Sequence, residues 1–200
     1  ADAGSAPVIM GNTFSGNQRP VSIYGRRIDN NLSENIYLDN YDAEAIPSNY
    51  IYVYGNTNDE RLYDNKTYDW LKDGAPYRIM GNLSVWEDGD INQVSILKIY
   101  PQTIVAFDPS KNLIIGQNSY GDAGALQADS VTFTAIDSTS GWNQIVFYNY
   151  TRDDLTLIKN STIEHAVNGI YCESADPTIS NSLIRNNTDG IEADAGSAPV

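Results

Sequence analysis

An octapeptide, ADAGSAPV, occurs twice in this chain of 200 residues. Residues 1–8 carry the first copy and residues 193–200 carry the second, so the two copies lie 192 residues apart. Repetition at a fixed distance constrains a fold more than any local pattern does, because each repeat must form the same structural unit. We therefore interpret residues 1–200 as a single repeat unit of a tandem array, in which 193–200 repeats 1–8.

A shorter repeat lies within the last third of the chain. Residues 158–172 (IKNSTIEHAVNGIYC) and 179–193 (ISNSLIRNNTDGIEA) share apolar and glycine positions at a constant spacing of about 21 residues. The matched pairs are Ile158 and Ile179, Ile163 and Ile184, Gly169 and Gly190, and Ile170 and Ile191. A strand–corner pattern that recurs at this spacing predicts the coil of a β-solenoid, in which each coil stacks on the previous one at about 4.8 Å.

If residues 193–200 are taken as residues 1–8 of a following copy, the short repeat continues into the residues after residue 8 of that copy. Pro177 aligns with Pro199, and Ile184 aligns with Phe14 of a following copy. We therefore expect consecutive units to be continuous, with no polar cap between them. The residues expected at the end-to-end contact are Pro7, Val8, Ile9, Ile179, Ile184, Ile191, Pro199 and Val200.

Short apolar runs rich in β-branched residues dominate the chain, and helical periodicity is scarce. The expected strands lie within residues 77–85, 91–107, 113–115, 125–128, 131–136 and 142–148. Such strands also suit a sandwich or a barrel, but the constant spacing of the short repeat favours a solenoid. The predicted fold class is all-β, a parallel β-helix of about 8–9 coils per unit, which would advance about 43 Å per unit.

Residues 26–69 are expected to form less regular coils with longer loops. The segments NIYLDNY and YIYVYGN within them have the composition of strands. In the second segment Tyr50, Tyr52 and Tyr54 would face one way, while Ile51 and Val53 face the other.

A series of aromatic, glycine and proline positions marks residues 70–147. They are Trp70; Gly74, Pro76 and Tyr77; Ile99, Pro101 and Thr103; Phe133 and Thr134; and Trp142, Ile145 and Phe147. This series resembles a recurrent opening segment of right-handed parallel β-helix repeat surface proteins, which share the pectate-lyase-like superfamily fold, except that Gln102 stands where that family prefers Gly. The resemblance implies a right-handed helix of the non-enzymatic tandem-repeat type. It leaves the function open, because such modules occur in adhesins, surface layers and polysaccharide-degrading enzymes alike.

The composition is acidic, with 26 acidic against 12 basic residues and a formal charge of −14. Nucleic acid is therefore not an expected partner, because phosphate binding needs Lys and Arg. Membrane insertion is not expected either, because no apolar run approaches the roughly 18 residues of a membrane span. The acidity fits a solvated surface or a cation-binding role, and the sequence leaves both open. The single cysteine, Cys172, occupies the position in its coil that Ala193 occupies in the next coil. This favours the interpretation of Cys172 as a small buried residue over that of a reactive thiol.

Two sets of candidate surface sites follow from short motifs. No cofactor is expected; calcium alone is left open, with acidic residues in DNYD and NDE as weak ligand candidates. These are Asp39, Asp42, Asp59 and Glu60. Six Asn-x-Ser/Thr sequons are glycosylation candidates, although asparagine is also favoured in left-handed corners and in stacked ladders, as at Asn160 and Asn181. The sequons begin at Asn31, Asn65, Asn82, Asn149, Asn160 and Asn186.

No catalytic constellation stands out. His165, beside Glu164, is the only histidine and has no nucleophile motif with it, so a surface role is the preferred interpretation. Carbohydrate cleavage would need a pair of carboxylates or a basic residue beside a uronate. The candidate acids all lie in turn-like settings where Asp is favoured for turn geometry alone, and Arg26-Arg27 is the only basic pair. These acids are Asp88 and Asp90, Asp153 and Asp154, and Asp39 with Asp42.

The sequence therefore predicts an extracellular or cell-surface structural protein and not an enzyme. Units would stack end to end into a rod, fibre, sheath or adhesin shaft, with copies of the same sequence as partners. The alternative is a cell-surface module that binds or cleaves carbohydrate in a lateral groove. Tyrosines suited to contacts with glycans keep that alternative open.

Overall fold

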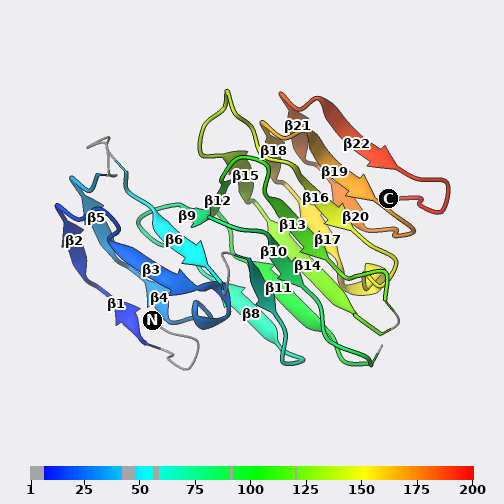
Figure 1. Cartoon of the computed structure of the whole chain (residues 1–200), viewed down its shortest axis with the longest axis horizontal. Coiled ribbons are helices and arrows are strands. Elements are labelled where there is room, and N and C mark those ends of the chain that lie inside the picture. Colours follow the sequence, from blue (N-terminus) through cyan, green and yellow to red (C-terminus); the bar gives the residue numbers. More distant parts are fainter. Residues whose placement is uncertain (1–6, 42–47, 56–58, 91, 120) are drawn as a thin grey trace.

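The computed structural model describes residues 7–41, 48–55, 59–90, 92–119 and 121–200. These residues form a parallel β-helix in which the paired strands of every sheet run parallel. Figure 1 shows the coils stacked along the long axis, with the N-terminal strands at one end and the C-terminal strands at the other. The all-β solenoid predicted from the sequence is confirmed.

Three long sheets form the faces of the solenoid. The seven-stranded sheet contains β3 (Val21–Tyr24), β6 (Ile51–Tyr54), β9 (Tyr77–Ile79), β12 (Ile104–Phe107), β15 (Thr132–Ala135), β18 (Thr162–Glu164) and β21 (Leu183–Arg185). The six-stranded sheet contains β7 (Glu60–Leu62), β10 (Leu83–Val85), β13 (Asn112–Ile115), β16 (Gln144–Phe147), β19 (Asn168–Cys172) and β22 (Asp189–Ala193). The five-stranded sheet contains β8 (Thr67–Trp70), β11 (Ser95–Ile99), β14 (Gly124–Asp129), β17 (Leu157–Lys159) and β20 (Thr178–Ser180).

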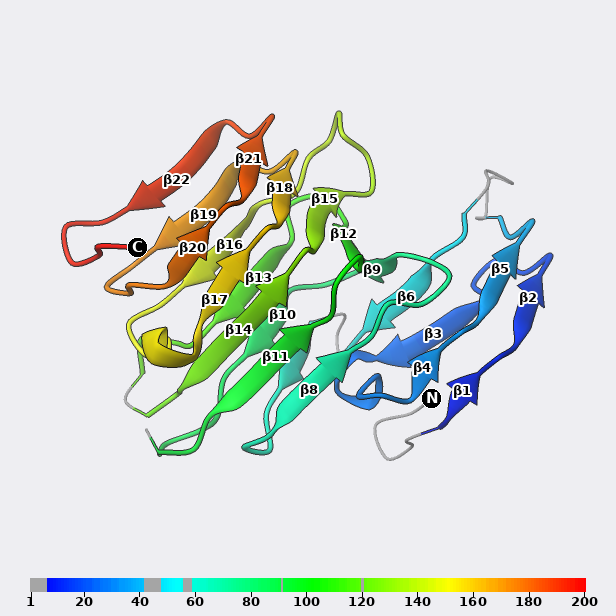
Figure 2. The same ribbon diagram turned by 180° about the vertical axis from the view of Figure 1, so that it is seen from behind.

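The N-terminal end has two additional short sheets, visible beside β3 in Figure 2. The first pairs β1 (Ile9–Met10) with β4 (Leu32–Ser33), and the second pairs β2 (Thr13–Ser15) with β5 (Ile36–Leu38). Two single-turn 3-10 helices, η1 (Gly25–Arg27) and η3 (Asp153–Leu155), occupy corners between strands. No helix in the described part of the chain is long and apolar enough to cross a membrane.

The longest sheet has seven strands, and the second octapeptide begins a further layer, so the described residues build seven complete coils and part of an eighth. The predicted spacing holds between the last two coils, where Ile158 pairs with Ile179 and Ile163 with Ile184. Earlier coils have longer corners, so that Ala128 pairs with Ile158, a wider interval than that between Ile158 and Ile179. At about 4.8 Å per coil, seven coils advance about 34 Å.

Along each strand, side chains point alternately into the core and away from it. In β6, Ile51 and Val53 lie in the core and stack on Tyr77 and Ile79 of β9, whereas Tyr52 points to the other face, in register with Arg78, and is also buried. The opposite orientations predicted for the tyrosines and the aliphatic residues of this strand are confirmed. The same two-residue period repeats in every long sheet, because inward side chains can be buried only if they lie above one another.

The aromatic positions of residues 70–147 are core residues. Trp70 and Tyr77 are fully buried, with ring centroids 5.2 Å apart, and Trp142 stacks on Phe107 of the preceding coil at 4.3 Å. Gly74 is required by close approach, because a Cβ there would lie 2.0 Å from the carbonyl oxygen of Asn35. These positions are therefore explained by packing.

Corners are made by residues with left-handed backbone conformation. Asn160 and Asn181 have φ angles of 51° and 50°, as the composition of the corners predicted. Residues 26–69, for which the sequence predicts less regular coils, lie on the N-terminal side of the long sheets. They hold η1 and strands β4 to β8, and residues 42–47 and 56–58 lie outside the described part of the chain.

Candidate functional site

The second octapeptide begins an eighth layer on the last complete coil. The Val200 N–H donates to the Pro177 carbonyl oxygen at 3.2 Å, which puts Val200 opposite Thr178 and Pro199 opposite Pro177. The Asp194 carboxylate accepts the Ser174 N–H at 3.1 Å, and the Ser197 hydroxyl accepts the Ala175 N–H at 3.2 Å. The predicted alignment of Pro177 with Pro199 is confirmed.

The exposed end of this coil is apolar. Ile179 and Ile184 are partly buried against the core, and Ile191 is 46 % exposed. Each of the three residues points along an inward column, in register with Ile158, Ile163 and Ile170 respectively. The end of the solenoid therefore presents the cross-section of its own core.

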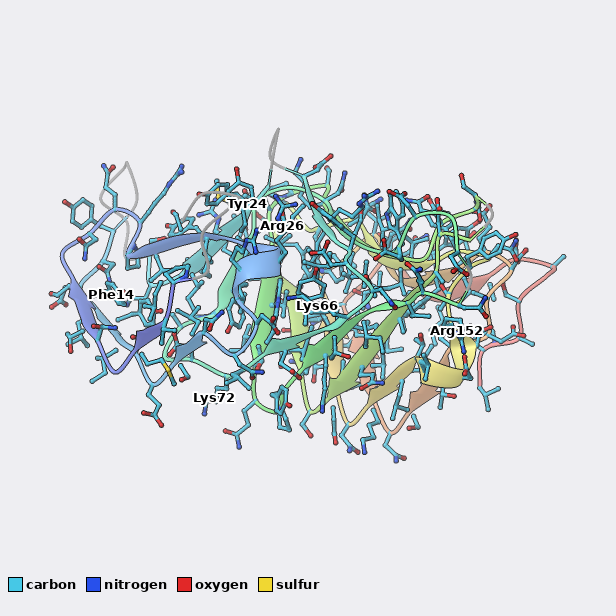
Figure 3. All side chains as sticks on the ribbon, turned by 90° about the horizontal axis from the view of Figure 1, so that it is seen from below. Phe14, Tyr24, Arg26, Lys66, Lys72 and Arg152 are labelled. Carbon is cyan, nitrogen blue, oxygen red and sulfur yellow. The ribbon has the colours of Figure 1, made fainter. Side chains whose placement is uncertain are left out.

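The opposite end is also apolar and is hollowed. A depression of about 380 Å³ is lined by Val8, Ile9, Phe14 and Val21 together with polar neighbours. Val8 is 69 % exposed, and the Phe14 ring stacks on Tyr37 of the next coil at 5.3 Å. Figure 3 shows Phe14 at this extremity of the molecule. The predicted contact residues thus divide between the two ends, with Pro7, Val8 and Ile9 at one end and the others at the far end.

A lateral groove of about 630 Å³ crosses the outer face of the five-stranded sheet. Its floor includes Lys98, Gln127 and Leu157, which follow one another in register on β11, β14 and β17. The Lys98 ammonium lies 4.9 Å from the centroid of the Tyr100 ring, and no ion pair of Lys98 is found within the described residues. A cation beside a half-exposed aromatic ring can hold a polar ligand.

The 3-10 helix η3 forms one wall of this groove, next to Arg152 in Figure 3. Burial raises the pKa of Asp153, whereas the hydrogen bond from Arg152 lowers the pKa of Asp154. A neighbouring pair with divergent pKa values is also seen in acid–base sites. Here Asp153 accepts the Asp176 N–H at 2.9 Å, and Asp176 in turn accepts the Ala198 N–H, so Asp153 is a member of a corner ladder.

The other sequence-derived acid candidates are engaged in surface structure. Asp88 forms a salt bridge with Arg61 at 3.0 Å, and Asp90 accepts the Asn92 N–H within its own turn. Glu164 forms a salt bridge with Arg185 at 2.8 Å and lies 4.0 Å from His165.

Cys172 is fully buried and in register with Ala193, as predicted. Burial raises the pKa of its thiol to about 12, so it is not a thiolate at neutral pH.

The calcium candidates lie in different settings. Asp39 is exposed after β5, Asp59 accepts the Asn82 N–H at 2.7 Å, and Glu60 is buried. Asp42 lies outside the described residues. Within the described residues no group of three or more His, Cys, Asp or Glu side chains is arranged to hold a metal ion.

Several sequon side chains belong to ladders along the helix axis. Asn82 accepts from the Asn112 backbone at 3.0 Å, Asn65 accepts the Val94 N–H at 2.9 Å, and Asn160 donates to Asp129 at 3.0 Å. Asn149 and Asn186 are exposed, and Asn31 is half-buried. Of the six sequons, those at Asn149 and Asn186 therefore leave the amide most accessible.

Sequence reasoning missed a cluster around Glu60. The Arg26 N–H donates to Glu60 at 3.0 Å, and the Arg26 guanidinium lies over the rings of Tyr24 and Tyr63. Figure 3 shows Tyr24 and Arg26 side by side on the N-terminal coils. The cluster joins residues far apart in the sequence, so no local pattern announced it.

Comparison with known proteins adds no relative. No family model, curated protein or solved structure matches this chain. The stacked parallel sheets agree with the architecture implied by the resemblance at residues 70–147, while membership of that superfamily stays a prediction.

Proposed function

We propose that this chain is a structural unit of an extracellular β-helical rod or fibre, built by end-to-end stacking of copies of the same sequence. The observation that carries the proposal is the position of the second octapeptide, residues 193–200, which packs on the last complete coil. Residues 193–200 repeat residues 1–8, and Val200 already pairs with Thr178 as the first residue of a next strand. A following copy would continue that strand with β1.

The two ends of the described stack fit the same proposal. Both present apolar cross-sections of the core, on which a further layer of the same sequence would fit. Covering them with another copy satisfies the backbone groups and buries the exposed apolar side chains. A stiff rod with a continuous backbone ladder suits a stalk, sheath or adhesin shaft at a cell surface, and needs no catalytic residue.

Electron microscopy and fibre diffraction of the native surface material test this proposal. We expect fibres with layer lines near about 4.8 Å and an axial repeat near about 34 Å, because seven coils form one unit. Discrete particles without fibres, over a wide range of salt and calcium concentrations, would contradict it.

The lateral groove favours a second candidate, a carbohydrate-binding surface module. Lys98 and Tyr100 offer a hydrogen-bond donor beside an aromatic face, an arrangement that suits a sugar ring and its hydroxyls. Titration calorimetry with oligosaccharides tests it. Binding that Tyr100→Ala lowers at least tenfold (about 1.4 kcal/mol), and Lys111→Ala leaves unchanged, supports this candidate. Release of reducing ends, lost in Asp153→Asn, would extend it to cleavage.

A further inference from the structure

Polar ladders run along two corners of the solenoid and stop at its C-terminal end. At the first corner the Val131 N–H donates to the Ser161 hydroxyl at 3.2 Å, and the Ser161 N–H donates to the Ser182 hydroxyl at 3.2 Å. At the second corner the Ala166 N–H donates to Asn187 Oδ1 at 2.8 Å. Within the described residues, the backbone N–H groups of Ser182 and Asn187 have no acceptor.

The N-terminal coils contain two ladders of the same kind. The Asn12 N–H donates to Asn35 Oδ1 at 3.0 Å, and the Asn35 N–H donates to Asp73 at 2.7 Å. In parallel, the Asn17 N–H donates to Asn40 Oδ1 at 2.9 Å. Within the described residues, Asn12 Oδ1 and Asn17 Oδ1 accept no hydrogen bond. The N-terminal ladders therefore begin with a free acceptor, and the C-terminal ladders end with a free donor.

The position of residues 193–200 on the last coil fixes the register between the C-terminal end of one copy and the N-terminal end of the next. Val200 lies opposite Thr178, and residue 9 follows the same octapeptide at its first occurrence. Continuing at this offset places Ile9 opposite Ile179, Phe14 opposite Ile184 and Val21 opposite Ile191. All three faces then receive an inward apolar residue of the following copy.

The same offset also aligns the corners. It places Asn12 opposite Ser182 and Asn17 opposite Asn187, so each open donor meets an open acceptor. A ladder of this kind already enters the eighth layer at the third corner, where the Ala198 N–H donates to Asp176 and the Asp176 N–H donates to Asp153.

We propose that residues 9–24 of a following copy dock on β20, β21 and β22 at this register, with Pro7 and Val8 of that copy taking the place of the identical Pro199 and Val200, and with Asn12 and Asn17 Oδ1 accepting the backbone N–H groups of Ser182 and Asn187. This inference rests on the proposed stacking function and specifies its interface. At this register β3 of the following copy lies on β22.

Cysteine cross-linking of the full chain tests the register. Met10 falls opposite Ser180, and both side chains point outward, so a disulfide between them meets the usual Cα separation for adjacent strands. In a Cys172→Ala background, chains carrying Met10→Cys are mixed with chains carrying Ser180→Cys and oxidised. We expect a disulfide-linked dimer from the mixture and none from either chain alone.

A shifted pair is the matched control. Thr13→Cys lies further along the chain, opposite Leu183, and should not cross-link to Ser180→Cys because strand residues are about 3.3 Å apart. Cross-linking of the shifted pair in place of the Met10 pair overturns the register and leaves stacking intact. Sedimentation that shows no association at any salt or calcium concentration overturns both proposals.

The ladders are tested by a second pair of variants. Asn12→Ala and Asn17→Ala should each weaken association by at least about fivefold, because a neutral hydrogen bond contributes about 1 kcal/mol. Asn118→Ala, at an exposed position away from both ends, is the control. Unchanged association of folded Asn12→Ala and Asn17→Ala chains would show that the corner ladders do not carry the interface.

Discussion

The first and last coils of this solenoid are built differently. Between the last two coils, all three faces repeat at one and the same spacing, so each residue lies on its counterpart: Ile179 on Ile158, Ile184 on Ile163 and Ile191 on Ile170. Among the first coils the spacing varies from face to face. Ile9 pairs with Leu32, whereas Val21 pairs with Ile51, and more residues separate the second pair than the first.

Unequal spacing moves residues into corners, and those corners need contacts of their own. The N-terminal coils use a buried carboxylate, Asp73, which accepts from Asn35 and from the Tyr37 hydroxyl, and a second one, Glu60, beneath Arg26. The C-terminal coils use single hydroxyl contacts, as at Ser161. Regular coils are thus held by repetition of small contacts, and irregular coils by a few specific polar residues.

The largest expected effect on stability compares a residue in the middle of the stack with one at its N-terminal end. Phe107→Ala should reduce the free energy of unfolding by about 3–5 kcal/mol, because the ring is fully buried against Trp142. Phe14→Ala should cost about half as much in the isolated chain, because Phe14 is only partly buried. Denaturant titration followed by tryptophan fluorescence measures both. Equal costs would mean that the N-terminal end is covered in solution.

A smaller effect tests the irregular corners. Asp73→Ala should reduce the free energy of unfolding by about 3 kcal/mol, because it leaves the buried Asn35 N–H and Tyr37 hydroxyl without an acceptor. Ser161→Ala in the regular coils should cost about 1 kcal/mol, since one neutral hydrogen bond is lost. The same denaturant titration compares them, and Asp88→Ala on the surface serves as the control. A larger loss for Ser161→Ala would reverse the contrast between the two regions.

The pH dependence of the N-terminal coils follows from Glu60. Burial raises the pKa of this carboxyl from 4.5 to about 7, against the opposing effects of the Arg26 N–H and the nearby charges of Arg26 and Arg27. The folded chain therefore binds a proton more tightly than the unfolded chain, and stability is lost as the pH rises from about 4.5 through about 7.

Glu60→Gln removes this titration. The variant should be more stable than the parent chain at pH 8 by about 3 kcal/mol, and the difference should shrink toward pH 5. Thermal unfolding at several pH values measures it. A gain that is equal at pH 5 and pH 8 would show that Glu60 does not titrate in this range.

The smallest effect concerns the regular coils alone. Cys172 is buried with its thiol pKa raised to about 12, so thiol reagents should modify it only when the C-terminal coils open. Cys172→Ala should cost about 1 kcal/mol, because the next coil already carries Ala193 at the same place in the column. Labelling kinetics at neutral pH report the opening. Modification at the rate of a free thiol would show that these coils are loosely packed.

Most of the strands were predictable, because alternation of apolar residues between corner residues depends only on local geometry. Residues 95–99 and 104–107, for example, form strands within the predicted range 91–107. The coil number was not predictable from the short repeat, since longer corners consume residues without adding a layer. The Asn ladder left a trace that could have been found, because Asn12 and Asn17 recur as Asn35 and Asn40 at one constant interval.

By itself the sequence determined the parallel β-helix, the inward columns of the last coils and the alignment of the two octapeptides, because stacked layers require residues of the same kind at a constant spacing. Only the tertiary structure decided the number of coils, the lateral groove and the buried setting of Glu60 and Asp73. Those features depend on which corner lies above which, and that follows from corner lengths and long-range contacts that no local pattern encodes.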